Sequence, residues 1–136
     1  MASRESNVAL VRALYQRLLV GDLEAVQSRL DAKFVLRATD SLPYGGRREG
    51  VGALAESMQD FLKHWTEPQF DVREFTANDS GRVVAQIELR CVSKRNVAFS
   101  TTVIESWLLD DGLVRTLDVF YLDPGAALRA IHGLIA

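Results

Sequence analysis

The spacing of apolar residues changes once along this chain, close to Pro68, and this change limits the possible folds more than any other feature. Before Pro68, apolar residues recur every three or four positions, which places them on one face of an α-helix. After it, they alternate with polar residues, as in a β-strand with one buried face. The order of the two patterns predicts helices first and a sheet afterwards.

Three helices are predicted in the first half. The apolar face of the first consists of Val8, Val11, Leu14, Tyr15, Leu18 and Leu19. This helix ends at Gly21, and Asp22 can cap a short second helix. The apolar residues of the second helix are Leu23, Val26 and Leu30. A third helix follows Gly50 and is stopped by Pro68. Its apolar stripe consists of Val51, Leu54, Ala55, Met58, Phe61, Leu62 and Trp65.

The strand signals lie mostly in the second half. A short strand is predicted at 33–39, before a turn-rich loop at 40–46. Four longer strands are predicted at 69–77, 82–94, 97–109 and 113–122. The links between these four are short and rich in Asn, Asp and Gly, which favours an antiparallel meander. Pro124 can open a closing helix.

These elements predict a single α+β domain over residues 1–136, with three N-terminal helices packed on a curved antiparallel sheet. The last two strands carry apolar residues on both faces. Phe99, Val103 and Trp107 share one face, and Ile104 and Leu108 share the other. Because the helices can cover only one face, we expect the other to meet a second copy in a homodimer.

Composition excludes several classes of function. The net charge of −2 and the lack of a basic run argue against nucleic-acid binding. The chain has no signal peptide pattern and no apolar run long enough to cross a membrane, so we expect a cytoplasmic protein. Cys91 is the single cysteine, and neither His64 nor His132 has a second ligand at metal spacing. No metal site is predicted.

Three segments resemble the nuclear transport factor 2-like superfamily, and within it the SnoaL-like and ketosteroid isomerase-like proteins. They are LYQRLLVGDLEAV, LPYGGRREGVGAL and ESWLLDDGLVRTLDVFYLDP. The likeness spans nearly the whole chain. It implies a cone-shaped domain that encloses a pocket and is commonly dimeric. It implies no single activity, because the superfamily includes isomerases, polyketide cyclases, epoxide hydrolases, dehydratases and non-catalytic members.

Three residues are candidates for acid–base chemistry. Asp40 follows the short strand, close to where the resemblance implies a general-base carboxylate; it could equally cap the turn before Pro43. Glu105 shares a strand face with Trp107, and is either a carboxylate among apolar side chains or a surface residue. Tyr15, on the apolar face of the first helix, could donate a hydrogen bond to a ligand carbonyl or pack in the core. The predicted ligand-binding residues are Met58, Phe61, Trp65, Trp107 and Tyr121.

The position of Asp118 depends on the last hairpin. A two-residue turn would place Glu105 and Asp118 on the same face, and a three-residue turn over 110–112 would place them on opposite faces. We favour the three-residue turn, which also makes a Glu105–Arg115 ion pair feasible. SnoaL-like cyclases carry an acidic residue on the last strand facing the pocket, and Val119 occupies that place here.

Three functions are compatible with this pattern. The first is a cofactor-independent isomerase or cyclase that acts by proton transfer on a hydrophobic small molecule. In this function Asp40 is the base, and Tyr15 or Glu105 is the hydrogen-bonding partner. The second is a non-catalytic ligand-binding protein. The third is a dimerisation domain whose cavity is filled by side chains.

Overall fold

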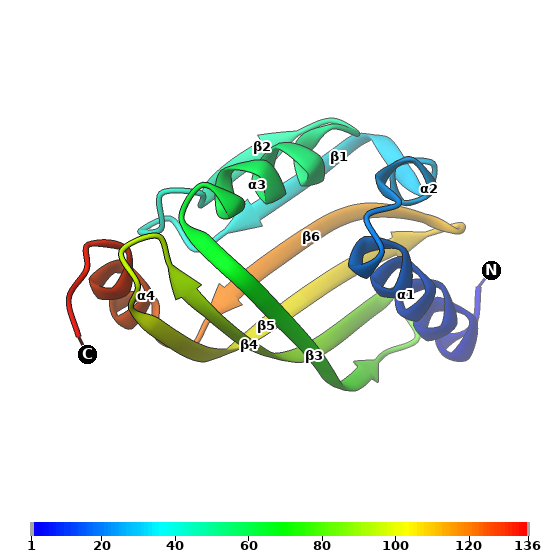
Figure 1. Cartoon of the computed structure of the whole chain (residues 1–136). Helices are drawn as coiled ribbons and strands as arrows, with labels where there is room; N and C mark the ends of the chain where they lie inside the picture. The colour runs from blue at the N-terminus through cyan, green and yellow to red at the C-terminus, as the bar shows by residue number, and fades with distance from the viewer. Residues whose placement is uncertain (1, 136) are drawn as a thin grey trace.

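The computed structural model describes residues 2–135 and contains four helices and six strands (Figure 1). The helices are α1 (Arg4–Leu19), α2 (Leu23–Gln27), α3 (Ala53–Leu62) and α4 (Pro124–Ile131). The strands are β1 (Leu30–Ala38), β2 (Gly46–Glu49), β3 (Trp65–Ala77), β4 (Arg82–Ser93), β5 (Ala98–Asp110) and β6 (Leu113–Tyr121). The predicted α+β class is confirmed.

All six strands form one sheet in the order β2-β1-β6-β5-β4-β3. The predicted antiparallel meander is confirmed for β3 to β6, which pair in sequence order. Two features were not predicted. The first strand pairs in parallel with β6, and the short edge strand β2 pairs antiparallel with β1. The sequence of β2 is Gly-Arg-Arg-Glu, which lacks the apolar alternation by which strands are recognised.

The helices α1 and α3 lie on the same side of the curved sheet, and α4 lies at one end of it (Figure 1). Contacts join α1 to β3 and β4, α3 to β1, β2 and β3, and α4 to β4 and β5. Leu30 was expected on the second helix, but α2 ends at Gln27 and Leu30 begins β1, where it pairs with Val114. No helix within residues 2–135 is both long and apolar enough to cross a membrane.

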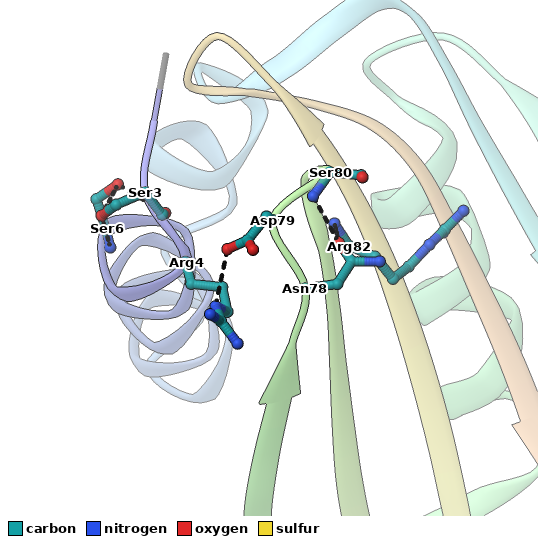
Figure 2. Close-up of polar contacts among 7 residues, drawn as sticks. All are labelled: Ser3, Arg4, Ser6, Asn78, Asp79, Ser80 and Arg82. Atoms are coloured by element: carbon teal, nitrogen blue, oxygen red, sulfur yellow. Dashed lines mark hydrogen bonds and ion pairs between the residues drawn. The ribbon is translucent and has the colours of Figure 1, made fainter.

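The first turn of α1 is attached to the turn between β3 and β4 (Figure 2). Ser3 caps the helix by accepting a hydrogen bond from the Ser6 amide at 3.1 Å. Arg4 Nε lies 2.9 Å from Asp79 in that turn. Asn78 Oδ1 accepts hydrogen bonds from the Ser80 and Arg82 amides at 2.9 and 3.0 Å, which fixes the turn. These contacts lie at the start of α1, and further along it Val11, Leu14 and Tyr15 are buried where the helix contacts β3 and β4.

The third helix ends before Trp65, which the apolar stripe had placed on it. The amides of Lys63 and His64 bond to carbonyls three residues back, so the last turn tightens and closes the helix. The His64 carbonyl accepts instead from the amide of Lys94, which directly follows the neighbouring strand β4, at 2.9 Å. Trp65 therefore begins β3, where it pairs with Ser93.

The turn of the β5–β6 hairpin has two residues, so the predicted three-residue turn is wrong. Asp110 pairs with Leu113, and Asp111 and Gly112 both have positive φ values, 52° and 80°. Both central residues of a type I′ turn require such values. A bulge then leaves Arg115 without a partner, because Leu109 pairs with Val114 and Leu108 with Thr116.

The bulge shifts the pairing by one residue, so residues of β6 face the same way as a three-residue turn would have made them face, although they pair two residues further along. Glu105 pairs with Val119, and Ser106 pairs with Asp118. Glu105 and Asp118 consequently point to opposite faces of the sheet, as predicted, although for a different reason. The Glu105–Arg115 ion pair does not form, because Arg115 bonds to Asp110 at 2.9 Å and approaches Asp31 at 3.4 Å.

Candidate functional site

An interior cavity lies between the helices and the side of the sheet that they cover. It has two adjoining lobes of about 260 and 180 Å³. The larger, here the α1 lobe, lies against Tyr15, Leu18 and Trp107. The smaller, here the α3 lobe, lies against Tyr44, Phe61 and Tyr121. Residues that line both lobes are Leu54, Met58, Pro68, Phe70, Ile87 and Glu105.

The mouth of the cavity is formed by the most exposed of its lining residues. Leu19 at the end of α1 is 57% exposed, Leu62 at the end of α3 is 48% exposed, and Phe70 on β3 is 38% exposed. Residues deeper in the lining, such as Ile87 and Trp107, are buried. The cavity therefore opens through an apolar rim contributed by two helices and one strand.

Glu105 is the one carboxylate among the described residues that line either lobe. It projects from β5 onto the cavity side of the sheet, between Val103 and Trp107. Its apolar surroundings desolvate the ionised form and raise the pKa of Glu105, while the hydrogen bond from Tyr15 lowers that pKa. The net effect is a carboxyl group that holds its proton to higher pH than an exposed glutamate does.

Tyr15 and Trp107 fix one oxygen of this carboxyl group. The Tyr15 hydroxyl donates to Glu105 Oε1 at 2.7 Å and accepts from the Trp107 indole nitrogen at 2.8 Å. The two rings also pack edge to face, with centroids 5.4 Å apart. Within the described residues, no hydrogen bond is made to Glu105 Oε2. One oxygen is therefore held while the other is available to a molecule in the cavity.

A second cluster joins Trp65, Tyr44 and Tyr121. Trp65 Nε1 donates to the Tyr44 hydroxyl at 3.2 Å, and the two tyrosine hydroxyl oxygens are 2.9 Å apart. Trp65 is 1% exposed and stacks on Phe99 with centroids 5.2 Å apart. Trp65 was predicted to bind ligand, but it lies behind Tyr44 and lines neither lobe.

The other predicted ligand-binding residues lie at the cavity. Met58 lines both lobes, Phe61 and Tyr121 line the α3 lobe, and Trp107 lines the α1 lobe. Tyr44 was overlooked because it stands in a loop, between Pro43 and two glycines, where apolar periodicity carries no information. The feature that could have identified Tyr44 is its aromatic side chain, which stands within a turn-forming segment.

Asp40 lies apart from Glu105 and Tyr15. The Leu42 amide bonds to the Thr39 carbonyl at 3.2 Å, and the resulting turn leaves Asp40 exposed. Asp40 lines a separate depression of about 470 Å³ together with Arg37 and Asp118. It is therefore not desolvated by the interior cavity, on which its expected role as a base depended.

Asp118 also belongs to the outer side. The Arg37 guanidinium forms two hydrogen bonds with its carboxylate, at 2.7 and 2.8 Å. Val119 faces the α3 lobe in its place, as the residue count from Gly112 predicted. Across residues 2–135, no three His, Cys, Asp or Glu side chains come close enough together to hold a metal ion.

Comparison with known proteins identifies a family to which the sequence is similar and solved structures that share the fold. The model of the SnoaL-like domain family matches residues 11–116. No curated protein matches the sequence.

Many solved structures share the fold. An NTF2-like protein of unknown function from Burkholderia pseudomallei K96243 aligns with a TM-score of 0.83 and 21% identity, over 92% of this chain and 96% of its own. TerC, co-crystallised with polyporic acid, aligns at 0.82 and 19% identity, over 93% and 98%. A protein provisionally named a SnoaL-like polyketide cyclase, from Jannaschia sp. CCS1, aligns at 0.81 and 17% identity, over 96% and 94%. At these identities the similarity shows the fold.

Proposed function

The chain belongs to the SnoaL-like domain family, and from this premise we propose that it binds an apolar, carbonyl-bearing small molecule and transfers a proton on it through Glu105. The observation that carries the proposal is the arrangement of Glu105. Its carboxyl group lies among apolar side chains, with Oε1 bound to Tyr15 and Oε2 open to the cavity. The provisional cyclase among its structural relatives is compatible with this chemistry.

The size of the cavity limits the substrate. Pockets for small molecules hold about 300 Å³ or more, and each lobe is smaller than that, at about 180 and 260 Å³. A substrate must therefore extend across both lobes, and in doing so it passes Glu105, which lines both. Aromatic and aliphatic walls suit a ring system better than a charged metabolite.

The proposed step is the removal and return of one proton. Glu105 Oε2 takes a proton from the carbon next to the substrate carbonyl, and the electron pair of the broken C–H bond forms an enolate. The same carboxyl group then returns the proton to a different carbon, which isomerises the substrate without a cofactor. In a cyclisation, the enolate carbon would instead form a bond to the carbon of a second carbonyl group in the same molecule. The oxygen of that second carbonyl group then takes the proton from Glu105. The raised pKa of Glu105 makes it a stronger base once ionised.

Deuterium exchange tests this proposal directly. We would incubate the protein with 1-tetralone in D₂O and follow loss of the α-proton by NMR. Glu105→Gln keeps an acceptor for Tyr15 but cannot take up a proton, so the exchange rate should fall at least about 100-fold. Glu88→Gln is the matched control, because Glu88 lies on the other face of the sheet and bonds to Thr102. Exchange at the wild-type rate in Glu105→Gln would refute the proposal.

A non-catalytic binding protein is the second candidate. Val119 lines the α3 lobe at the position where SnoaL-like cyclases carry an acid, so the cavity has one carboxylate among the described residues rather than two. The deciding result is a wild-type protein that binds 1-tetralone but promotes no exchange of the α-proton, either of 1-tetralone or of other cyclic ketones. In that case the binding function replaces proton transfer.

A further inference from the structure

The polar groups of the cavity are ordered along β5. Trp65 stacks on Phe99 near the start of the strand, and Trp107 lies near its end. Between them, Tyr121 is paired with Val103, and Glu105 follows two residues later. Each tryptophan donates to a tyrosine hydroxyl at its own end of the row. The two clusters therefore converge on the stretch of β5 that lines the middle of the cavity.

Counting protons shows that the Tyr44–Tyr121 pair has one to spare. An indole nitrogen can only donate, so Trp65 occupies one acceptor position on the Tyr44 oxygen. The two hydroxyl groups hold two protons, and the single contact between them uses one. Tyr44 donates to Tyr121 in this contact, so the proton left over is that of the Tyr121 hydroxyl. No other hydrogen bond from either hydroxyl is present in the described part of the chain.

The spare proton faces the cavity at Tyr121. Tyr44 is 3% exposed, whereas Tyr121 is partly accessible, and both line the α3 lobe. The side chains of Tyr121 and Glu105 are diagonal neighbours on one face of the hairpin, because Glu105 pairs with Val119, two residues before Tyr121. Such neighbours have Cβ atoms about 7 Å apart. That spacing leaves room for a carbonyl group and the carbon beside it.

We propose that the Tyr121 hydroxyl donates a hydrogen bond to the carbonyl oxygen of the ligand, and that Tyr44 and Trp65 position this donor. The inference rests on the proposed function, to which it adds the group that recognises the carbonyl. Burial raises the pKa of Tyr44 to about 12 and raises the pKa of Tyr121 well above its ordinary value, so both hydroxyls keep their protons at neutral pH. The ligand class is a ring compound with a hydrogen-bond acceptor at the α3 lobe and a removable proton at Glu105.

A matched pair of probes isolates this hydrogen bond. 1-Tetralone and tetralin share a ring system but differ in the carbonyl group, and their binding would be measured by protein-observed NMR titration. Wild-type protein should prefer 1-tetralone by about 2- to 12-fold, the range expected for one net hydrogen bond. Tyr121→Phe should abolish that preference while leaving tetralin binding unchanged. Thr116→Val is the matched control, since it removes a hydroxyl from the outer face of the same strand.

Infrared difference spectroscopy supplies a second readout that a purely structural role would not alter. The carbonyl stretch of bound 1-tetralone should lie at lower frequency in wild type and Thr116→Val than in Tyr121→Phe. Equal frequencies, or an unchanged preference for the ketone in Tyr121→Phe, would overturn the inference.

The outcomes separate this inference from the function on which it rests. If both probes bind wild type equally, ligand binding stands and the role of Tyr121 falls. If deuterium exchange depends on Glu105 but the ketone preference does not depend on Tyr121, the same conclusion follows. If neither probe binds, both proposals fail.

Discussion

Removal of the Tyr15 hydroxyl tests whether the cluster around Glu105 contributes to stability as its geometry indicates. The substitution Tyr15→Phe keeps the ring that packs on Trp107 and Phe75. It leaves the indole N–H of Trp107, a residue that is 0% exposed, without its acceptor. An unpaired buried donor costs about 1–3 kcal/mol. The substitution also removes the hydrogen bond from Tyr15 to Glu105, which is worth about 1.5–3 kcal/mol if the carboxylate is charged.

The two terms add to an expected loss of unfolding free energy of about 2.5–6 kcal/mol. The lower part of the range applies if water in the cavity replaces Tyr15 as a donor to Glu105. Such a loss is a large fraction of the 5–15 kcal/mol that is typical of a domain, and it lowers the melting temperature by roughly 10–20 °C. Urea unfolding followed by tryptophan fluorescence should show a lower midpoint with an unchanged slope.

A second background separates the two bonds. In Glu105→Gln the acceptor of Tyr15 is neutral, so Tyr15→Phe should cost about 1 kcal/mol less there than in wild type. A loss below about 1 kcal/mol in the wild-type background would refute the reasoning. It would mean that the Trp107 N–H finds another partner or that the two bonds are not formed.

Two further predictions concern pH and assembly. The pKa of Glu105 is raised in the folded state, so the unfolded chain loses this proton first, and wild-type stability should fall as pH rises above the unfolded value of about 4.3. Glu105→Gln lacks this contribution, so its stability relative to wild type should increase with pH in chemical denaturation, and parallel pH profiles would contradict the assignment. We also propose that a second copy covers the outer face of the sheet, where Phe120 is 55% exposed and pairs with Ile104. Sedimentation should then show a wild-type dimer and a Phe120→Glu monomer; a monomeric wild type would dismiss this arrangement.

Apolar periodicity was sufficient to predict the first helix and most of β3 to β6, because apolar residues recur on one face of each, and Pro124 was sufficient to predict α4. It failed where helix and strand adjoin. Trp65 lies at helical spacing from Phe61, so the pattern alone could not show that backbone pairing with β4 begins at His64. The charged edge strand β2 escaped detection because its pairing depends on backbone groups of β1 rather than on side chains.

The candidate site was predictable in part. Glu105, Tyr15 and Trp107 could each be placed on the correct face from spacing, but their mutual contacts depend on how α1 crosses the sheet. Asp40 was proposed from its place after the first strand in similar proteins, and a turn directed by Thr39 and Leu42 places it outside. Side chains in loops follow local hydrogen bonds, which strand and helix periods do not describe.

The bulge at Arg115 has a consequence for the chemistry of the fold. Neighbouring residues on a strand face opposite sides of the sheet. One extra residue therefore decides which alternate residues of β6 face the cavity. A deletion there would turn Val119 outward and bring the Asp118 carboxylate inside beside Glu105, while separating it from Arg37. Gain or loss of one residue near this hairpin would therefore change a cavity with one carboxylate, Glu105, into a cavity with two, Glu105 and Asp118. Neither acidic residue would itself be substituted.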